Sequence, residues 1–387
     1  MNKMRDLLSK TLVVGVIVLF LSVAITPMSL GIKIVSDRLE VKEAKSSIDE
    51  EDSRTVIIVD DEGDGDYTSI QDAIGNATSG DIIEVYSGIY HEKKILITTE
   101  DIILKGIPYE LGAGNDFGKP VIKDITDIGS LITFNNSEII VDGLVLEGNE
   151  SHFLYNIVSF VIGDNNVLSN CDIIKGNGLG SCVRVTHKIK NTKIINNNLS
   201  AMGTGIDLAG INNSVIGNRI NNMKSYGIIC NNKNCNVSGN LISECDWGIL
   251  IGCNNTISNN IISECDIGIE LYEKLENVTI EYNEFKHNMN GILILSEQRQ
   301  VKMFYRNNII KNLIDVCYVH FGKLHPSFNT WYGNYWNKWK RIGPKRIFGI
   351  RLIPIFFIPT DFPFIIFIPF IRTVAYDLHP AKEPYEI

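Results

Sequence analysis

Hydrophobic residues along the chain fall in short alternating segments that recur about every 22 residues. In each copy an apolar residue stands three positions before an asparagine, and another stands two positions after it. Eight or nine residues later comes a second motif, Gly-Ile-x-apolar, as in Gly248-Ile249-x-Ile251. Because both motifs keep their phase, we expect one structural unit per copy. The recurring asparagines are Asn197, Asn218, Asn240, Asn260, Asn283 and Asn307.

Each copy predicts β-strands rather than helices. Its apolar segments are short, alternate with polar residues and are rich in β-branched side chains, which is typical of half-buried strands. A leucine-rich repeat has a similar period and a similar Asn-containing core, but its second half packs as a helix or 3₁₀ segment. Since the Gly-Ile-x-Ile half favours a strand, the sequence predicts an all-β parallel β-helix, with the leucine-rich repeat as the alternative.

The repeat also predicts which side chains stack. A coil of about 22 residues returns each position to the same place, with neighbouring strands about 4.8 Å apart. Isoleucines stacked on isoleucines then form a continuous core. Stacked asparagine side chains can hydrogen-bond from coil to coil, as they do in cross-β ladders. We therefore expect the six asparagines to form a structural ladder at a turn, which asparagine tolerates well, and not to be catalysts.

The N-terminus predicts export. Lys3, Arg5 and Lys10 precede the apolar run Thr11–Leu30, which fits either a cleaved signal peptide or a retained membrane anchor better than a buried core helix. Basic residues before the run place the rest of the chain outside the cytoplasm, secreted or anchored to the membrane or cell envelope. The chain divides into a signal peptide or anchor (1–31), a polar linker (32–54), an N-terminal cap with the first coils (55–110), β-helix repeats (111–320) and a C-terminal cap segment (321–387).

Both ends of an open solenoid need covering, because they expose strand edges. The segment Thr68-Ser69-Ile70-Gln71 predicts a short capping helix that runs to about Ala77. Near the other end, residues 352–371 are strongly apolar but contain four prolines, which oppose a regular helix. We expect this segment to pack on the last coil, with a membrane crossing as the less favoured alternative.

The two ends also carry a resemblance to a known family. Val59-Asp60-Asp61, followed by Asp66–Ile74 and Gly80–Tyr90, resembles the opening segment of the NosD-like group, which is related to carbohydrate-binding and sugar-hydrolase (CASH) domains and to the pectin-lyase-like fold. Trp331–Trp336 and Asp377–Tyr385 resemble the terminal segment of archaeal members. Over about 55–387 this resemblance implies an exported right-handed parallel β-helix. It fixes no activity.

The net charge of the chain argues against nucleic acid as a partner. The chain has 36 Lys and Arg residues against 45 Asp and Glu residues, a formal net charge of −9. Without a long basic run it is a poor candidate for binding nucleic acid through phosphates. An extended solenoid face instead suits a long polymer such as a polysaccharide.

A duplicated tetrapeptide provides the candidate catalytic carboxylates. Ser-Glu-Cys-Asp occurs at 243–246 and again one coil later at 263–266. Stacking would bring Asp246 near Asp266 and Glu244 near Glu264, at a separation that suits a retaining glycosidase. A duplicated solvent-exposed turn explains the repeat better, and no full catalytic signature is evident. The sequence therefore leaves open whether the chain is an enzyme.

Aromatic and sulfur-containing residues are the other candidates. Cys245, Cys265 and Met223 share one column, which could bind Cu(I), a soft ion, but such residues are also ordinary core fillers, and we favour that interpretation. The eight cysteines could form disulfides in an exported protein, although side chains stacked in parallel give poor disulfide geometry. No cofactor is expected. The candidates for stacking on sugars are Trp247, Tyr272, Trp331 and Trp336.

Three functions follow from these observations. The first is binding, and possible processing, of a polysaccharide at the cell surface or in the environment. The second is a structural or adhesive surface protein without enzymatic activity. The third is a NosD-like copper accessory protein.

Overall fold

The computed structural model describes residues 54–387, with gaps at 113, 126–128, 149–154, 175–179, 201–202, 273–276, 296–301, 322–328, 340–343, 358–363 and 378. The expected signal peptide or anchor, and the linker up to residue 53, lie outside the described residues. The described part contains no helix with the length and apolar character needed to span a bilayer.

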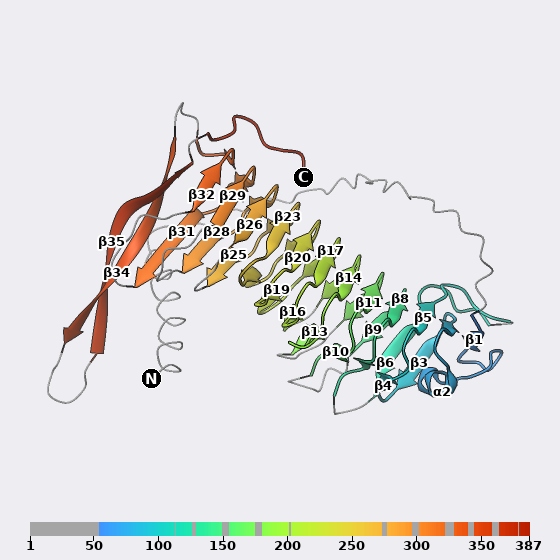
Figure 1. Ribbon diagram of the computed structural model, residues 1–387. Helices are drawn as coiled ribbons and strands as arrows, with labels where there is room; N and C mark the ends of the chain where they lie inside the picture. The colour runs from blue at the N-terminus through green and yellow to red at the C-terminus, as the bar shows by residue number, and fades with distance from the viewer. Residues whose placement is uncertain are drawn as a thin grey trace. The chain divides into compact units, whose positions relative to one another are not determined.

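Short parallel strands stack coil upon coil and form three faces (Figure 1). After its first strand, each strand of the first face is followed in the chain by one of the second face and one of the third. The first face contains β1 (Val56–Val59), β2 (Ile82–Val85), β5 (Ile103–Gly106), β8 (Ile140–Asp142), β11 (Val167–Ser169), β14 (Lys193–Ile195), β17 (Ser214–Ile216), β20 (Asn236–Ser238), β23 (Thr256–Ser258), β26 (Val278–Glu281), β29 (Lys302–Tyr305) and β32 (Thr330–Tyr332).

The other two faces are built in the same way, and the second is a sheet of 11 strands. It contains β3 (Ile89–Glu92), β6 (Val121–Asp124), β9 (Val145–Glu147), β12 (Asp172–Ile174), β15 (Asn198–Ser200), β18 (Arg219–Asn221), β21 (Leu241–Ser243), β24 (Ile261–Ser263), β27 (Glu284–Lys286), β30 (Asn308–Ile310) and β33 (Tyr335–Trp336). The third face contains β4 (Ile95–Ile97), β7 (Ile132–Asn135), β10 (Val158–Ile162), β13 (Ser181–Val185), β16 (Thr204–Leu208), β19 (Tyr226–Cys230), β22 (Trp247–Ile251), β25 (Ile267–Tyr272), β28 (Asn290–Leu295), β31 (Ile314–Phe321) and β34 (Lys345–Phe357).

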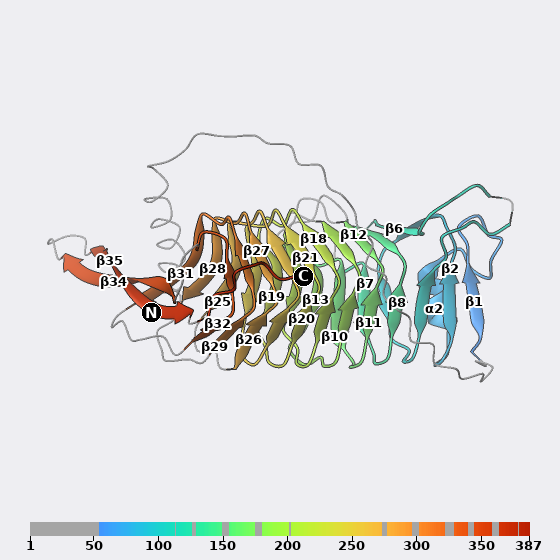
Figure 2. The ribbon, with the colours of Figure 1, turned by 90° about the horizontal axis from the view of Figure 1, so that it is seen from above.

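The pairing register follows the sequence repeat. Val237 pairs with Ile257 on the first face, Ile242 with Ile262 on the second, and Ile249 with Ile269 on the third. Equivalent residues of consecutive copies therefore lie over one another. Figure 2 shows the stacked strands from a second direction. The predicted parallel β-helix is confirmed, and the leucine-rich repeat alternative is wrong because the second half of each copy is a strand.

Stacked apolar side chains fill the space between the three faces. One column of the first face is fully or almost fully buried over eight coils and ends in two stacked aromatic rings, Phe304 and Trp331, whose centroids are 3.8 Å apart. Burying one such aliphatic side chain contributes about 1.5–3 kcal/mol. The column contains Leu168, Ile194, Val215, Val237, Ile257, Ile280, Phe304 and Trp331.

The ladder asparagines also form a single file. The backbone N–H of Asn218 donates to Oδ1 of Asn240 over 2.9 Å, and that of Asn240 donates to Oδ1 of Asn260 over the same distance. Each side-chain Nδ2 adds a bond to the same oxygen and another to a backbone carbonyl of the previous coil, such as Val215 O for Asn240. A buried amide at the corner of each of these coils is thereby satisfied.

The ladder is longer than the repeat motif alone predicts. Asn307 donates to Oδ1 of Asn334, and Asn334 donates to Oδ2 of Asp377 through both its backbone N–H and its Nδ2. Trp336 Nε1 donates to the same carboxylate oxygen over 2.9 Å. The N–H of His379 donates to Oδ1 of Asp377, so the file of amides ends on a fully buried carboxylate that accepts four hydrogen bonds.

The left-handed turn residue is the one before each ladder asparagine, and not the ladder asparagine itself as the turn argument suggested. Asn196 and Asn259 have φ near 55°, and Gly217 and Gly239 near 65°. Asparagine and glycine adopt this conformation with little strain. Asparagine therefore serves two purposes here: one residue turns the chain and the next carries the hydrogen bonds.

A short helix, α2 (Ile70–Asn76), lies near the β1 end of the solenoid (Figure 1). Ser69 is its N-cap and accepts a hydrogen bond from the N–H of Asp72, while Ile70, Ala73 and Ile74 are buried in the core. The helix thus lies where the sequence predicts it. Its role as a cap, like the five domain boundaries, stays a prediction.

The proline-containing apolar segment forms two long strands. Strands β34 and β35 (Phe364–Asp377) pair in antiparallel fashion from Lys345–Asp377 to Phe357–Phe364. Strand β34 also pairs in parallel with β31 from Gly349 to Leu352, so the pairing with the last coil reaches the first residue of the apolar segment 352–371. That the rest of this segment packs on the last coil stays a prediction. Pro354 lies just past that point, where β34 pairs in antiparallel fashion with Phe367 of β35.

The buried ladder predicts a large effect of one truncation. Asn240→Ala leaves the N–H of Asn218 and the carbonyl of Val215 without their side-chain partners, so we expect a loss of about 3 kcal/mol in unfolding free energy. Thermal or urea unfolding measures it. Exposed Asn231→Ala is the control, with an expected change below about 0.5 kcal/mol. Equal effects of the two variants would contradict the ladder.

Candidate functional site

Two aspartates and two aromatic rings gather where the strands of the third face begin. Trp247 pairs with Ile267 in the next coil, so the residues just before them, Asp246 and Asp266, are neighbours. Burial raises the pKa of Asp266, the charge of Asp246 raises it further, and Lys224 lowers it. The two carboxylates are therefore close enough to influence one another, as the duplicated tetrapeptide predicts.

Beside these carboxylates lies a pair of stacked rings. Tyr226 opens β19 and Trp247 opens β22, and their ring centroids are 5.0 Å apart at an interplanar angle of 26°. Both side chains are half-buried, so part of each ring faces solvent. Flat apolar surface next to hydrogen-bonding carboxylates is an arrangement suited to a sugar ring, which has apolar C–H faces and hydroxyls at its edge.

Glu244 and Glu264 are turn residues. Both are exposed and have φ of 55° and 57°, the left-handed conformation found at the other corners of the coil. The N–H of Glu244 donates to Ser263 O in the next coil. The duplication of these two glutamates thus has the structural explanation that the sequence favoured.

Two of the tryptophans proposed to stack on sugars are core residues, which corrects that expectation. Trp331 and Trp336 are each 2% exposed, and their indole N–H groups donate to the Tyr318 hydroxyl and to Asp377. Neither ring is accessible to a ligand. Tyr272 ends β25, but its side chain lies outside the described residues.

The sulfur-containing column lies inside the solenoid. Met223 is fully buried and Cys245 and Cys265 are each 3% exposed, with their thiols donating to Ser243 O and Ser263 O. A hydrogen bond with Cys245 raises the pKa of Cys265, and burial raises it further. Because Cu(I) binds thiolates and the raised pKa of Cys265 opposes thiolate formation there, the buried column fits core packing better than a copper site. None of the eight cysteines, all of which lie in the described part of the chain, forms a disulfide.

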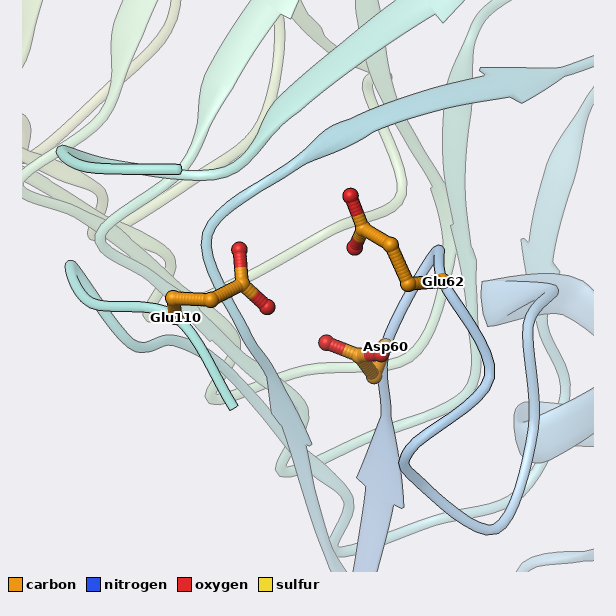
Figure 3. A group of neighbouring side chains, drawn as sticks. All are labelled: Asp60, Glu62 and Glu110. Atoms are coloured by element: carbon orange, nitrogen blue, oxygen red, sulfur yellow. The ribbon is translucent and has the colours of Figure 1, made fainter. Parts of the chain in front are cut away.

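A second group of carboxylates lies at the N-terminal end (Figure 3). Ligand atoms of Asp60, Glu62 and Glu110 all lie within 4.8 Å of one another, and so do those of Asp61, Glu62 and Asp116. A hydrogen bond with Asp61 is the main reason why the pKa of Glu62 rises to about 7. Sequence analysis missed this group because Glu110 is 48 positions beyond Glu62 (110 − 62), in a loop that no repeat motif marks.

Comparisons with known proteins agree with this architecture. The family model described as "Right handed beta helix region" matches residues 156–314. The A-modules of two mannuronan C-5 epimerases from Azotobacter vinelandii are similar in structure. For AlgE6 the identity is 14% over 68% of this chain and 83% of that chain, with a TM-score of 0.53; for AlgE4 it is 13% over 68% and 84%, with a TM-score of 0.51. No curated protein matches in sequence.

At these identities the likeness to solved structures is one of fold. Together with the three parallel faces, it makes the chain a right-handed parallel β-helix repeat protein, as predicted. The closer affinity to the NosD-like group and to CASH domains stays a prediction.

Replacing a buried tryptophan should destabilise the protein more than replacing a half-buried one. Trp336→Ala removes a buried ring and a hydrogen bond to Asp377, so we expect a loss of about 3–5 kcal/mol. Trp247→Ala removes a half-buried ring, and we expect about 1 kcal/mol. Thermal unfolding of both variants measures the difference. A loss for Trp247→Ala as large as for Trp336→Ala would show that Trp247 is also core.

The aspartate pair predicts two opposite changes in pKa. Asp246→Asn removes a like charge, so the pKa of Asp266 should fall. Lys224→Gln removes an attractive charge, so the same pKa should rise. Carboxyl ¹³C chemical shifts followed through a pH titration report both changes. A pKa of Asp266 that stays constant in both variants would show that the three side chains do not interact.

Proposed function

We propose that this chain is an exported protein that binds a polysaccharide across the starts of the third-face strands. The observation that carries the proposal is the stacked pair of Tyr226 and Trp247 beside Asp246 and Asp266. The rings would stack on sugar rings, and the carboxylates would accept hydrogen bonds from sugar hydroxyls. Export is supported by the basic and apolar N-terminal sequence.

The neighbours in fold support a polymer ligand. The two epimerase A-modules act on mannuronan, as their names say, and they use the same kind of solenoid. A parallel β-helix presents the same position again at each coil, which suits a chain of repeating sugar units. This support is an analogy between folds, and so the residues of the site must be tested directly.

Charge favours a neutral or amino-sugar polymer over a polyuronate. The net charge of the chain is −9, and the two aspartates are side by side. A polyanionic chain laid across them would be repelled. A neutral polymer can donate its hydroxyl protons to the carboxylates, and a protonated amino group would be attracted to them.

The affinity of a neutral polysaccharide found on a glycan array tests the proposal. Trp247→Ala should weaken binding at least about tenfold, which corresponds to about 1.4 kcal/mol, whereas Trp247→Phe should retain most of it. Tyr376→Ala removes an exposed ring elsewhere and should change nothing. If no glycan binds, or if the Tyr376 variant loses as much as the Trp247 variant, the structural or adhesive alternative takes its place.

The same protein sample also tests whether the chain cleaves the polymer. Growth of reducing ends in a wild-type digest, lost in Asp246→Asn and Asp266→Asn, would assign an acid–base role to this pair. Binding without new reducing ends would leave the chain as a binding protein.

A further inference from the structure

Five carboxylates are crowded together at the N-terminal end of the described solenoid. Among residues that the structure describes, no Lys or Arg forms an ion pair with Asp60, Asp61, Glu62, Glu110 or Asp116. Negative charges within 4.8 Å of one another repel strongly when part of the group is shielded from water. Such a group needs either protons or a cation to lower its free energy.

One member of this group is buried and only half satisfied. The Asp60 side chain is 0% exposed, and its Oδ2 accepts a hydrogen bond from the N–H of Asp64. Its Oδ1 has no hydrogen-bond partner. In Figure 3 the Asp60 carboxylate points toward the space that Glu62 and Glu110 also face. A buried carboxylate oxygen without a partner is costly, and a ligand bound in that space would offer the Asp60 carboxylate a partner.

Two glycines let the backbone lie very close to carboxylates of this region. A Cβ atom on Gly88 would meet a carboxylate oxygen of Asp61 at 2.0 Å, and one on Gly112, where φ is +76°, would meet the Asp64 carboxylate at 1.9 Å. Glu110 is held by hydrogen bonds from the N–H groups of Leu111 and Asp116. Glycines at these positions let two loops far apart in sequence place their carboxylates together.

We propose that Asp60, Glu62 and Glu110, with Asp61 and Asp116 beside them, bind a calcium ion. The donors are all carboxylate oxygens, which are the ligands of hard divalent cations and not of copper or zinc thiolate sites. Five carboxylates in two loops can supply the six to eight oxygen ligands of Ca²⁺ together with water or backbone carbonyls. The cation would satisfy Asp60 Oδ1 and neutralise the repulsion.

The site would tie two segments of the solenoid end together. Asp60, Asp61 and Glu62 follow β1, while Glu110 and Asp116 belong to the loop between β5 and β6. A bound cation would therefore link the segment after β1 to the loop between β5 and β6, about two coils further along the chain. Binding to the folded state alone stabilises it, so calcium should raise the melting temperature.

Calcium titration of the full chain by calorimetry tests the proposal. We expect one ion per chain with a Kd at or below about 1 mM, the range of extracellular calcium modules. Glu110→Gln and Asp116→Asn should each weaken binding at least about tenfold. Asp116 is exposed, and no hydrogen bond to its side chain is present among the described contacts, so its variant should fold even if Asp60→Asn does not.

The matched control is the double variant Glu244→Gln and Glu264→Gln, which removes two exposed carboxylates elsewhere. It should bind calcium as the wild type does. The proposal is overturned if the wild-type protein shows neither heat of binding nor a rise in melting temperature up to about 10 mM Ca²⁺, well above the expected Kd. It is also overturned if the control loses as much affinity as the Glu110 variant, because general surface charge would then explain the binding.

Discussion

Coil-to-coil register is the constraint on which this molecule depends. Backbone ladders on three faces and the file of buried asparagine amides both require that equivalent residues lie over one another. A slip of one residue would turn the buried side chains of a strand outward. It would also leave Asn218 and Asn240 with unpaired buried amides. Packing and hydrogen bonding thus fix the same register, which is why the apolar columns are continuous.

The repeat made most of this architecture predictable. Asn218, Asn240 and Asn260 recur with a matching apolar pattern, and a strict period in sequence becomes a column in space. The repeat predicts which column each residue belongs to, but it did not predict that the last side chains of a column are buried. Trp331 and Trp336 occupy core columns that hold isoleucine in earlier coils, such as Ile257 and Ile262, so two rings that suggested a sugar site are interior.

Sites outside the repeat were beyond the reach of periodicity. Asp60 and Glu110 meet because a loop folds back on the first coils, and no regular spacing records that contact. The hairpin of β34 and β35 is similar, since its prolines argued against a helix without specifying the partner strand. In contrast, Asp246 and Asp266 were predicted to be neighbours because each belongs to the repeat. Local pattern predicts contacts between coils, whereas long-range loop contacts require the structure.

The two proposed sites lie on different parts of the same solenoid. The third face offers rings and carboxylates at consecutive coils, where a polymer can contact both. At the N-terminal end of the described solenoid, crowded carboxylates lie where a cation could hold two segments together. One site concerns recognition and the other stability, so the failure of either leaves the other intact.

Amide hydrogen exchange of the ladder residues tests the central claim most directly. The backbone N–H groups of Asn218, Asn240 and Asn260 each donate to the side chain of the next asparagine in the file. They should therefore exchange only through cooperative opening and be protected to a similar degree as the strands beside them. Exchange of these three amides at the rates of exposed loop residues would show that the file of asparagines, and the coil register built on it, does not exist in solution.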